Sequence, residues 1–363
     1  MINFDSDKRI LVTGGAGFIG GALIRKLLLE SPKSKVFNLD KLGYASDFIT
    51  NNYLLNHPKF SKNYKFFNIN LKNLDEVENV IKLSNPDIIF HLAAESHVDR
   101  SIGNPSVFIE SNILGTFNLL NASLKYWKNL SSGRKSDFRF LHVSTDEVFG
   151  SLGKTDTKFN ESTPYDPKSP YSASKACSDH LVKAWHHTYG FPALITNCSN
   201  NFGPRQFPEK LIPLVIQKAI YGEKIPMYGD GSNIRDWLYV NDHIDALLLV
   251  ISRGLSGQTY CIGGYGENTN LNVIKSICQI LNIYKPRENN LLYEDLICKV
   301  PDRIGHDFRY AINSKKITDE LGWFPKYKFI DALEITIKWY LDNLNWCKKI
   351  ADKSGYRGER LGG

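Results

Sequence analysis

The amino-acid sequence predicts an α/β protein: a Rossmann-type doubly wound parallel sheet with a smaller, interleaved C-terminal substrate-binding domain. Three observations predict this fold class. Short apolar runs alternate with amphipathic helical patterns through about the first 200 residues, a Gly-rich turn directly follows the first apolar run, and the regular alternation is lost after that point. Repeated strand–helix alternation is typical of parallel sheets with right-handed crossovers.

The composition is that of an ordinary globular protein. The 363 residues are 42% hydrophobic and 23% charged, which is enough for one large domain or two unequal ones. The net charge of +7 suits a small anionic substrate, but the basic residues are dispersed, which disfavours nucleic-acid binding. No apolar run approaches membrane-spanning length and the first strand leaves no room for a signal peptide, so we expect a cytoplasmic protein without membrane contact. The six cysteines lack metal-ligand spacing, so we expect reduced thiols and no metal site.

The first 40 residues have the order of a dinucleotide-binding unit. An apolar strand over 8–13 is followed by Gly-Gly-Ala-Gly-Phe-Ile-Gly at 14–20, an amphipathic helix over 18–30, and a second strand over 35–39 that ends in Asp40. This strand, turn, helix, strand and acid in register form a much stronger signal than the glycines alone.

Each part of this unit has a physical role in binding NAD. Gly14 permits the tight turn, Gly17 lets the backbone approach a pyrophosphate, and Gly20 permits close helix–strand packing. The helix N-terminus supplies amide donors and positive dipole charge. Asp40 is placed to accept hydrogen bonds from a ribose and would repel a 2′-phosphate, so the sequence favours NAD over NADP.

The remaining elements follow by periodicity. We expect strands at 64–69, 87–92 and 138–143, helices at 74–83 and 106–127, and polar loops at 129–137 and 150–170. Beyond about residue 200 we expect helices at 213–221, 242–252, 272–281, 314–321 and 329–344, and strands at 237–240 and 258–262. The predicted domains are an NAD-binding Rossmann domain over 1–202 that also receives about 237–263, a substrate domain over 203–236 and 264–345, and a C-terminal tail over 346–363.

The candidate chemistry lies between residues 144 and 175. Thr145, Asp146 and Glu147 follow the strand over 138–143, so they should emerge at the carboxyl edge of the sheet, where ligands bind in this fold. Two adjacent carboxylates beside a hydroxyl pack poorly but form a good acid/base set.

Tyr171 and Lys175 are four residues apart in a helical pattern that Pro170 introduces, so they should share one helix face. An ammonium beside a phenol favours the phenolate, which could then act as a base at neutral pH. A Tyr-x-x-x-Lys spacing alone is more often a surface pair. Here it follows the nucleotide-binding pattern with Thr145 in between, which favours the catalytic interpretation.

Several longer blocks make the chain similar to one known family. They are His91–Ser101, Ser144–Gly150, Asn197–Asn201, Phe207–Pro213, Arg235–Val240 and Asp302–Asp307. With the Gly-rich turn and the Tyr171–Lys175 pair, they resemble the extended short-chain dehydrogenase/reductase superfamily, and within it the family of dTDP-glucose 4,6-dehydratases. The resemblance covers nearly the whole chain.

The resemblance implies that dTDP-glucose loses water to give dTDP-4-keto-6-deoxyglucose in deoxysugar biosynthesis, with NAD regenerated. Tyr171, assisted by Lys175 and Thr145, would take the 4-hydroxyl proton while hydride leaves C4. Glu147 would then remove the C5 proton, and Asp146, protonated because burial or its neighbour raises its pKa, would protonate the departing 6-hydroxyl.

The resemblance also implies the ligand contacts. The cofactor would be held by Gly14, Gly17, Phe18, Ile19, Gly20, Asp40, Lys41, Asn70, Leu71, Ala93, Tyr171, Lys175 and Asn200. The substrate would be held by Ser96, His97, Asn200, Glu209, Lys210, Leu211, Arg235, Arg303 and His306. Arg235 and Arg303 suit a diphosphate, which guanidinium groups bind bidentately. Glu209–Lys210 could instead be a solvated turn, and His306 a structural histidine.

Four positions depart from the family pattern: Asn70 replaces an Asp, Gly43 a Thr, Arg205 an aromatic residue and Ile304 a Pro. None of them removes a catalytic group, although Arg205 adds a cation near the substrate blocks. The family resemblance further implies a homodimer that pairs the 106–127 helix with the helix carrying Tyr171. The apolar Phe108, Ile113, Leu119 and Leu120 could serve that interface or the core.

Three other functions fit parts of this pattern. An epimerase or decarboxylase would keep Tyr171 and Lys175 but would not require Asp146 and Glu147. A catalytically inactive NAD-sensing regulator would have a degraded Thr145, Tyr171 and Lys175 set, which is complete here. A purely structural protein is weaker still, so the sequence favours the dehydratase.

Overall fold

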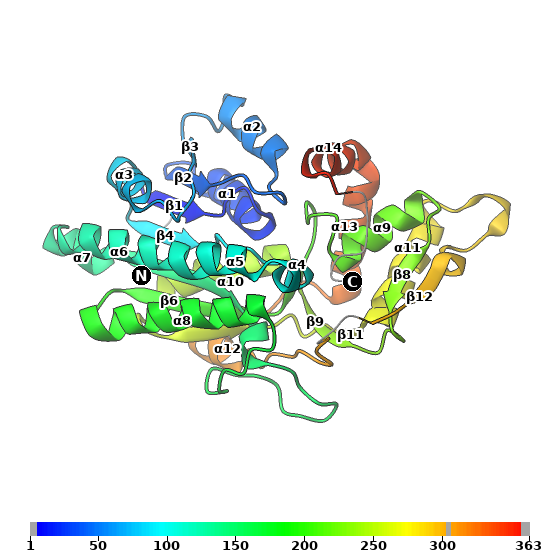
Figure 1. Cartoon of the computed structure of the whole chain (residues 1–363). Helices are drawn as coiled ribbons and strands as arrows, with labels where there is room; N and C mark the ends of the chain where they lie inside the picture. Colours follow the sequence, from blue (N-terminus) through cyan, green and yellow to red (C-terminus); the bar gives the residue numbers. More distant parts are fainter. Residues whose placement is uncertain (1–5, 303–305, 357–363) are drawn as a thin grey trace.

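A seven-stranded parallel sheet forms the centre of the larger part of the molecule (Figure 1). The computed structural model describes residues 6–302 and 306–356. The strands are β1 Arg9–Thr13, β2 Lys35–Asp40, β3 Tyr64–Asn68, β4 Ile88–His91, β5 Arg139–Thr145, β6 Ala193–Cys198 and β10 Thr259–Ile262. Their order is β10-β6-β5-β4-β1-β2-β3, and every neighbouring pair is parallel. This confirms the doubly wound sheet and places its topological switch point between β1 and β4, where such sheets bind ligands.

Helices cover both faces of this sheet. On one face lie α3 (Leu74–Ser84), α6 (Gly115–Lys128) and α8 (Pro170–Tyr189), and on the other lie α1 (Phe18–Glu30) and α10 (Val240–Arg253). Side chains of β1 alternate between the two cores, since successive residues of a strand point to opposite faces. Leu11 joins the core under α3, whereas Ile10 and Val12 join the core under α1.

The long helix predicted over 106–127 is interrupted by a π-helical turn. It consists of α5 (Pro105–Phe108), the π-helix η1 (Ile109–Leu114) and α6. Within η1, the Asn112 carbonyl accepts a hydrogen bond from Ser178 Oγ at 2.8 Å, and Asn112 Nδ2 donates to Ser174 Oγ at 2.8 Å. The widened turn therefore fastens this helix to α8, which carries the candidate catalytic residues.

Several short helices were not predicted, and two of them are held by side-chain hydrogen bonds. The expected loop over 129–137 contains α7 (Ser132–Asp137), because Arg134 bonds to Asp87, with Nη2 2.7 Å from Oδ1, and holds the turn in place. The helix α2 (Phe48–Asn56) follows β2 in the chain, and its N-cap residue Asp47 accepts a hydrogen bond from the Thr50 amide at 2.9 Å.

The second half of the chain builds a smaller unit beside the carboxyl edge of the sheet (Figure 1). It contains the sheets β11-β9-β7 and β12-β8, made from β7 Asn200–Phe202, β8 Ile225–Tyr228, β9 Ile234–Tyr239, β11 Glu267–Thr269 and β12 Ile297–Val300. Its helices include α9 Leu211–Ile220, α11 Asn270–Tyr284 and α13 Phe329–Asp342, whereas α12 Lys315–Leu321 packs against α10 and β10 of the larger part. The strand predicted at 237–240 overlaps β9, which lies in this small sheet. The chain therefore rejoins the larger part only with α10 and β10. The domain boundaries themselves stay a prediction.

The predicted C-terminal tail is partly a helix. α14 (Leu344–Ser354) lies beside α2, and its Trp346, Cys347 and Ile350 are buried (Figure 1). Trp346 Nε1 donates to Asp47 Oδ1 at 3.1 Å. The helix was not predicted, because its few apolar residues are interrupted by lysines and the segment is polar overall.

Two features bear on the expectations of reduced thiols and of no membrane contact. All six cysteines lie in the described residues, none forms a disulfide there, and four of them are buried. Among the helices of residues 6–302 and 306–356, none is long and apolar enough to cross a membrane.

Candidate active site

The carboxyl end of β5 turns directly into a short 3-10 helix, η2 (Asp146–Phe149). Thr145 caps it, since its Oγ1 accepts from the Glu147 amide at 3.3 Å and donates to Asp146 Oδ1 at 3.3 Å. Asp146 is 1% exposed, and its Oδ2 has no hydrogen-bond partner among the described residues. Burial, followed by the charge of Glu147, raises the pKa of Asp146 well above its ordinary value. Asp146 therefore has both features, burial and a neighbouring carboxylate, that the predicted role as a proton donor requires.

Helix α8 presents Tyr171 and Lys175 to this strand end. Ser169 forms a capping box with Ser172, and Pro170 occupies the first turn, so the helix begins where the sequence predicts. Tyr171 and Lys175 are both buried, at 7% and 3% exposure.

The environment of Tyr171 contains groups that act on its pKa in opposite directions. Burial and then the charge of Glu147 raise its pKa well above 10, while a hydrogen bond with Thr145 lowers it. The Lys175 ammonium instead donates to the Val143 carbonyl at 2.9 Å. The effect of Lys175 on the pKa of the phenol stays a prediction.

The Gly-rich turn has the geometry that a pyrophosphate requires. Gly14 has φ +72°, and a Cβ there would lie 2.6 Å from the Ala93 nitrogen, so only glycine fits. Gly17 is the N-cap of α1 and no side chain caps the helix, which leaves its first amides pointing outward. Asp40 is held at the end of β2 by amide donors from Ala16 and Leu42, at 3.0 and 2.7 Å.

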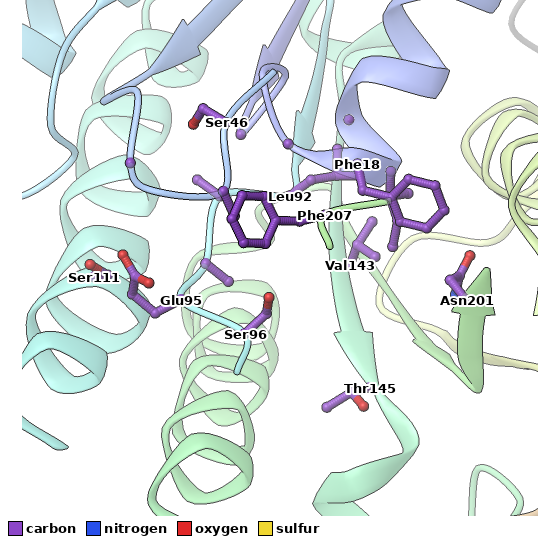
Figure 2. A pocket seen from close by; sticks show the side chains of 18 of the residues that line it. Phe18, Ser46, Leu92, Glu95, Ser96, Ser111, Val143, Thr145, Asn201 and Phe207 are labelled. Atoms are coloured by element: carbon purple, nitrogen blue, oxygen red, sulfur yellow. The ribbon is translucent and has the colours of Figure 1, made fainter. Parts of the chain in front are cut away.

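One cavity joins this turn to the end of β5 (Figure 2). Its lining includes every cofactor residue that the sequence predicts: Gly14, Gly17, Phe18, Ile19, Gly20, Asp40, Lys41, Asn70, Leu71, Ala93, Tyr171, Lys175 and Asn200. Phe18 from α1, Leu92 from the segment after β4 and Thr145 from β5 border it together in Figure 2. Ser199 Oγ and Asn200 Oδ1 are buried in its wall without a hydrogen-bond partner among the described residues. An uncapped helix N-terminus, a fixed carboxylate and unsatisfied polar atoms fit a dinucleotide such as NAD.

Four predicted substrate contacts, Ser96, Asn200, Glu209 and Lys210, line the same cavity. Glu209 is not a solvated turn residue, because it is 7% exposed. Its carboxylate accepts from Tyr44 Oη at 2.8 Å and from Arg100 Nε at 3.0 Å.

Among the described residues, four other predicted substrate contacts lie outside the lining of the cavity: His97, Leu211, Arg235 and His306. Arg235 donates to the carbonyls of Ile234 and Asp307, at 2.8 and 2.9 Å. His306 Nδ1 lies 2.6 Å from Asp302 Oδ1.

Three positions noted in the sequence lie apart from the cavity lining or outside the described residues. Arg303 and Ile304 lie outside the described residues. Arg205 does not line the cavity: its guanidinium lies 5.1 Å from the Trp339 ring centre, and its Nε lies 3.8 Å from Asp47 Oδ2, at the start of α2. Its effect on the substrate blocks stays a prediction.

The cavity also contains polar residues that sequence reasoning missed. Lys41 Nζ lies 2.6 Å from Glu95 Oε1 and 2.9 Å from Ser111 Oγ, so three separate segments are joined at the rim. Glu95 belongs to a family block and could have been named on that signal. Ser111 could not, because it enters the site through the π-helical turn.

The parallel sheet, the dinucleotide cavity and the Thr145, Tyr171 and Lys175 set define the class of short-chain dehydrogenase/reductase enzymes. The profile of the family described as GDP-mannose 4,6 dehydratase matches residues 11–336. The dTDP-glucose 4,6-dehydratase of Neisseria meningitidis serogroup B is 50% identical over 357 residues, which cover 98% of this chain and 99% of that protein. The chain belongs to the family of NAD-dependent nucleotide-sugar 4,6-dehydratases, among the dTDP-glucose 4,6-dehydratases.

Solved structures agree with this assignment. A Bacillus anthracis dTDP-glucose 4,6-dehydratase in complex with NAD is 41% identical, with a TM-score of 0.81 over 94% of this chain and 99% of that chain. A Streptomyces venezuelae dTDP-glucose 4,6-dehydratase with NAD and a second ligand bound is 39% identical, with a TM-score of 0.84 and the same coverage.

Proposed function

We infer that the protein converts dTDP-glucose to dTDP-4-keto-6-deoxyglucose and water as an NAD-dependent hydro-lyase of deoxysugar biosynthesis. One observation carries this inference beyond the fold: a buried, protonatable Asp146 lies next to Glu147 in the cavity that also holds Tyr171 and Lys175. Oxidation at C4 alone needs a phenol and an ammonium, whereas elimination of water needs a further acid and a further base.

NAD, when bound, supplies a hydride acceptor for C4, a hydride donor for C6 and, in its oxidised form, a positive charge. The outward amides of the turn around Gly17 would hold its pyrophosphate, and Asp40 its adenosine ribose. Asn200 Oδ1, buried and unsatisfied among the described residues, would accept a further hydrogen bond from the ligands.

Tyr171 and Thr145 act at the 4-hydroxyl. Thr145 donates a hydrogen bond to O4, and the Tyr171 phenolate accepts the hydroxyl proton. Because burial and Glu147 oppose ionisation of Tyr171, the base form depends on nearby positive charge. Lys175 is the buried cation that this chain provides.

Asp146 and Glu147 act at C6 and C5. The 4-ketone acidifies the C5 hydrogen, and Glu147, which is only partly buried at the cavity wall, accepts that proton. Asp146 gives its proton to the 6-hydroxyl, which leaves as water. The residues divide into acid and base because Asp146 is fully buried and Glu147 is not.

The substrate contacts are part of the proposal. Lys210 Nζ, which donates to the Ser96 carbonyl at 3.1 Å, marks the entrance on the nucleotide-sugar side. Arg235, Arg303 and His306 are the proposed diphosphate contacts. Arg235 would reach the diphosphate only after its side chain leaves the carbonyls of Ile234 and Asp307.

We further propose a cytoplasmic homodimer. Phe108, Leu119 and Leu120 belong to the core, whereas Ile109 and Leu114 are 49% and 41% exposed on the same helix. These exposed side chains lie beside α8 and would pair with a second copy. Light scattering of the purified protein tests this proposal, and Leu114→Lys should give a monomer.

The function is tested by incubating the protein with dTDP-glucose in deuterium oxide and following the product by NMR. The inference requires a 4-keto-6-deoxy sugar with deuterium at C5, and loss of that product in Glu147→Gln. Epimerisation at C4 without elimination would instead assign an epimerase. Reaction of UDP- or CDP-glucose alone would keep the chemistry and change the nucleotide.

A further inference from the structure

Behind the candidate catalytic pair lies a buried polar chain that the proposed mechanism does not use. Helix α8 presents Tyr171, Lys175 and Asp179 at intervals of one turn, so all three lie on the face that packs on the sheet. Asp179 is 0% exposed and Lys175 is 3% exposed. A carboxylate so fully buried requires compensation, because burial of an unpaired charge is strongly unfavourable.

His142 lies between the two charged groups of α8. It projects from β5 on the same side as Ser144, and its ring is 0% exposed. His142 Nε2 lies 3.3 Å from Lys175 Nζ and 3.1 Å from Asp179 Oδ1. One ring nitrogen is thus within contact distance of both the ammonium and the carboxylate.

The other carboxylate oxygen of Asp179 is firmly held. Asp179 Oδ2 accepts from Ser144 Oγ at 2.9 Å, from Tyr165 Oη at 2.9 Å and from Asn197 Nδ2 at 3.1 Å. Three donors, from β5, β6 and the loop that precedes α8, fix the carboxylate and favour its ionised form. Burial alone would raise the pKa of Asp179, but His142 and Lys175 lower it by more, so the pKa lies below its ordinary value.

We propose that Asp179 and His142 are positioning residues for the dehydratase reaction: Asp179 is the counter-ion that keeps Lys175 protonated, and His142 holds the ammonium in register beneath Tyr171. The proposal rests on the proposed function, in which a charged Lys175 supports the Tyr171 base. Among the groups around Lys175, Asp179 is the carboxylate with the largest influence in favour of the charged ammonium. The Val143 carbonyl is neutral, and the other titratable groups around the chain are His91, His142, Cys198, Tyr165, Tyr171, Asp146 and Glu147.

The protonation of these groups agrees with the geometry. Burial lowers the pKa of Lys175 to about 8, and Asp179 is the largest influence that raises it. Burial and then Lys175 lower the pKa of His142 to about 4, so the imidazole stays neutral at pH 7. Burial also raises the pKa of Cys198 and lowers that of His91, which leaves both neutral. The carboxylate of Asp179 therefore acts on the ammonium across the ring of His142 and not by direct contact.

The pH profile of turnover provides the first test. Lys175 must be protonated, so activity should fall as the pH rises through its pKa. In Asp179→Asn the pKa of Lys175 is lower, and the alkaline limb of kcat should move to lower pH by about one unit or more. Tyr165→Phe is the matched control, because it removes one hydrogen bond to Asp179 and keeps the charge. It should leave the limb in place.

A second measurement does not depend on turnover. The pKa of Lys175 can be followed by the 13Cε chemical shift in lysine-labelled protein carrying NAD, with the signal assigned by its loss in Lys175→Met. The midpoint should fall in Asp179→Asn and stay unchanged in Tyr165→Phe. An identical midpoint in Asp179→Asn and wild type would overturn the proposal. Because this readout is independent of substrate, failure of the dehydratase assay in wild type would count against the proposed function alone.

A pair of variants at position 142 keeps the test valid if Asp179→Asn does not fold. His142→Gln retains an amide that can contact both Lys175 and Asp179, and should keep the midpoint and the activity. His142→Leu has similar bulk without polar atoms, and should lower both. Equal loss in the two variants would indicate a packing role and refute the positioning role.

Discussion

The most informative perturbation is Asp146→Asn, because it replaces a buried acid with a neutral group of the same shape. The raised pKa of Asp146 means that the folded protein keeps this proton at a pH where the unfolded chain has lost it. Stability therefore falls as the pH rises between the unfolded and the folded pKa, by up to about 1.4 kcal/mol per pH unit. The variant lacks this proton, so its stability relative to wild type should improve steadily over that window.

The amide also introduces a fixed cost that does not depend on pH. It can still accept the hydrogen bond from Thr145, but its NH2 group takes the place of Oδ2, which has no partner among the described residues. An unsatisfied buried donor costs about 1–3 kcal/mol. The variant should thus be less stable than wild type in acid, and the difference in their free energies of unfolding should shrink as the pH rises.

Urea unfolding at a series of pH values, with the same NAD content in both proteins, measures this difference. Glu147→Gln is the control: it removes the second cause of the raised pKa, so the pH window over which Asp146 makes stability fall should narrow without vanishing. A stability difference between Asp146→Asn and wild type that is constant with pH would refute a raised pKa at Asp146. In the same protein, loss of the general acid should lower kcat by about 100- to 10,000-fold, and an unchanged kcat would refute the catalytic role.

Three further outcomes follow from the site and its supports. Tyr171→Phe should keep the fold and lower kcat by about 100-fold or more, as measured by product NMR, since it removes the base at O4. Gly14→Ala should lose about 1–3 kcal/mol of stability and also NAD binding, whereas Gly190→Ala, with a similar φ of +66° in open space, should lose stability alone; calorimetric titration with NAD separates the two. Trp346→Phe should lower stability by about 1 kcal/mol in thermal unfolding, because the hydrogen bond to Asp47 is lost, and an unchanged melting temperature would mean that α14 is not anchored there.

The sequence predicts best the elements whose own residues determine them. The predicted helix over 18–30 matches α1 at both ends, since the Gly-rich turn sets its start and an apolar stripe sets its packing. By contrast, α7 buries none of its residues and is held by the contact of Arg134 with Asp87, 47 positions away. Its stability comes from a tertiary contact that no local pattern reveals.

The same distinction applies to the site. Thr145 and Asp40 could be placed at one edge because parallel strands end together, and both line the cavity. The orientation of long side chains could not be predicted. Lys175 donates to a carbonyl of β5, and Arg235 donates to carbonyls of its own sheet region, because each satisfies buried acceptors that depend on the packed structure.

The π-helical turn η1 has a consequence for how this helix tolerates change. One residue advances an α-helix by about 100°, so deleting a single residue within 109–114 would restore regular hydrogen bonding and rotate α6 against α5 by that angle. If Asn112 kept its bonds to α8, Leu119 and Leu120, which are now buried, would point away from the core. If the two leucines stayed buried, Asn112 would lose its bonds to α8. The extra residue of the π-helical turn thus sets the rotation of α6 about the helix axis relative to α5. A length change that a surface loop would absorb is therefore excluded at this point of the chain.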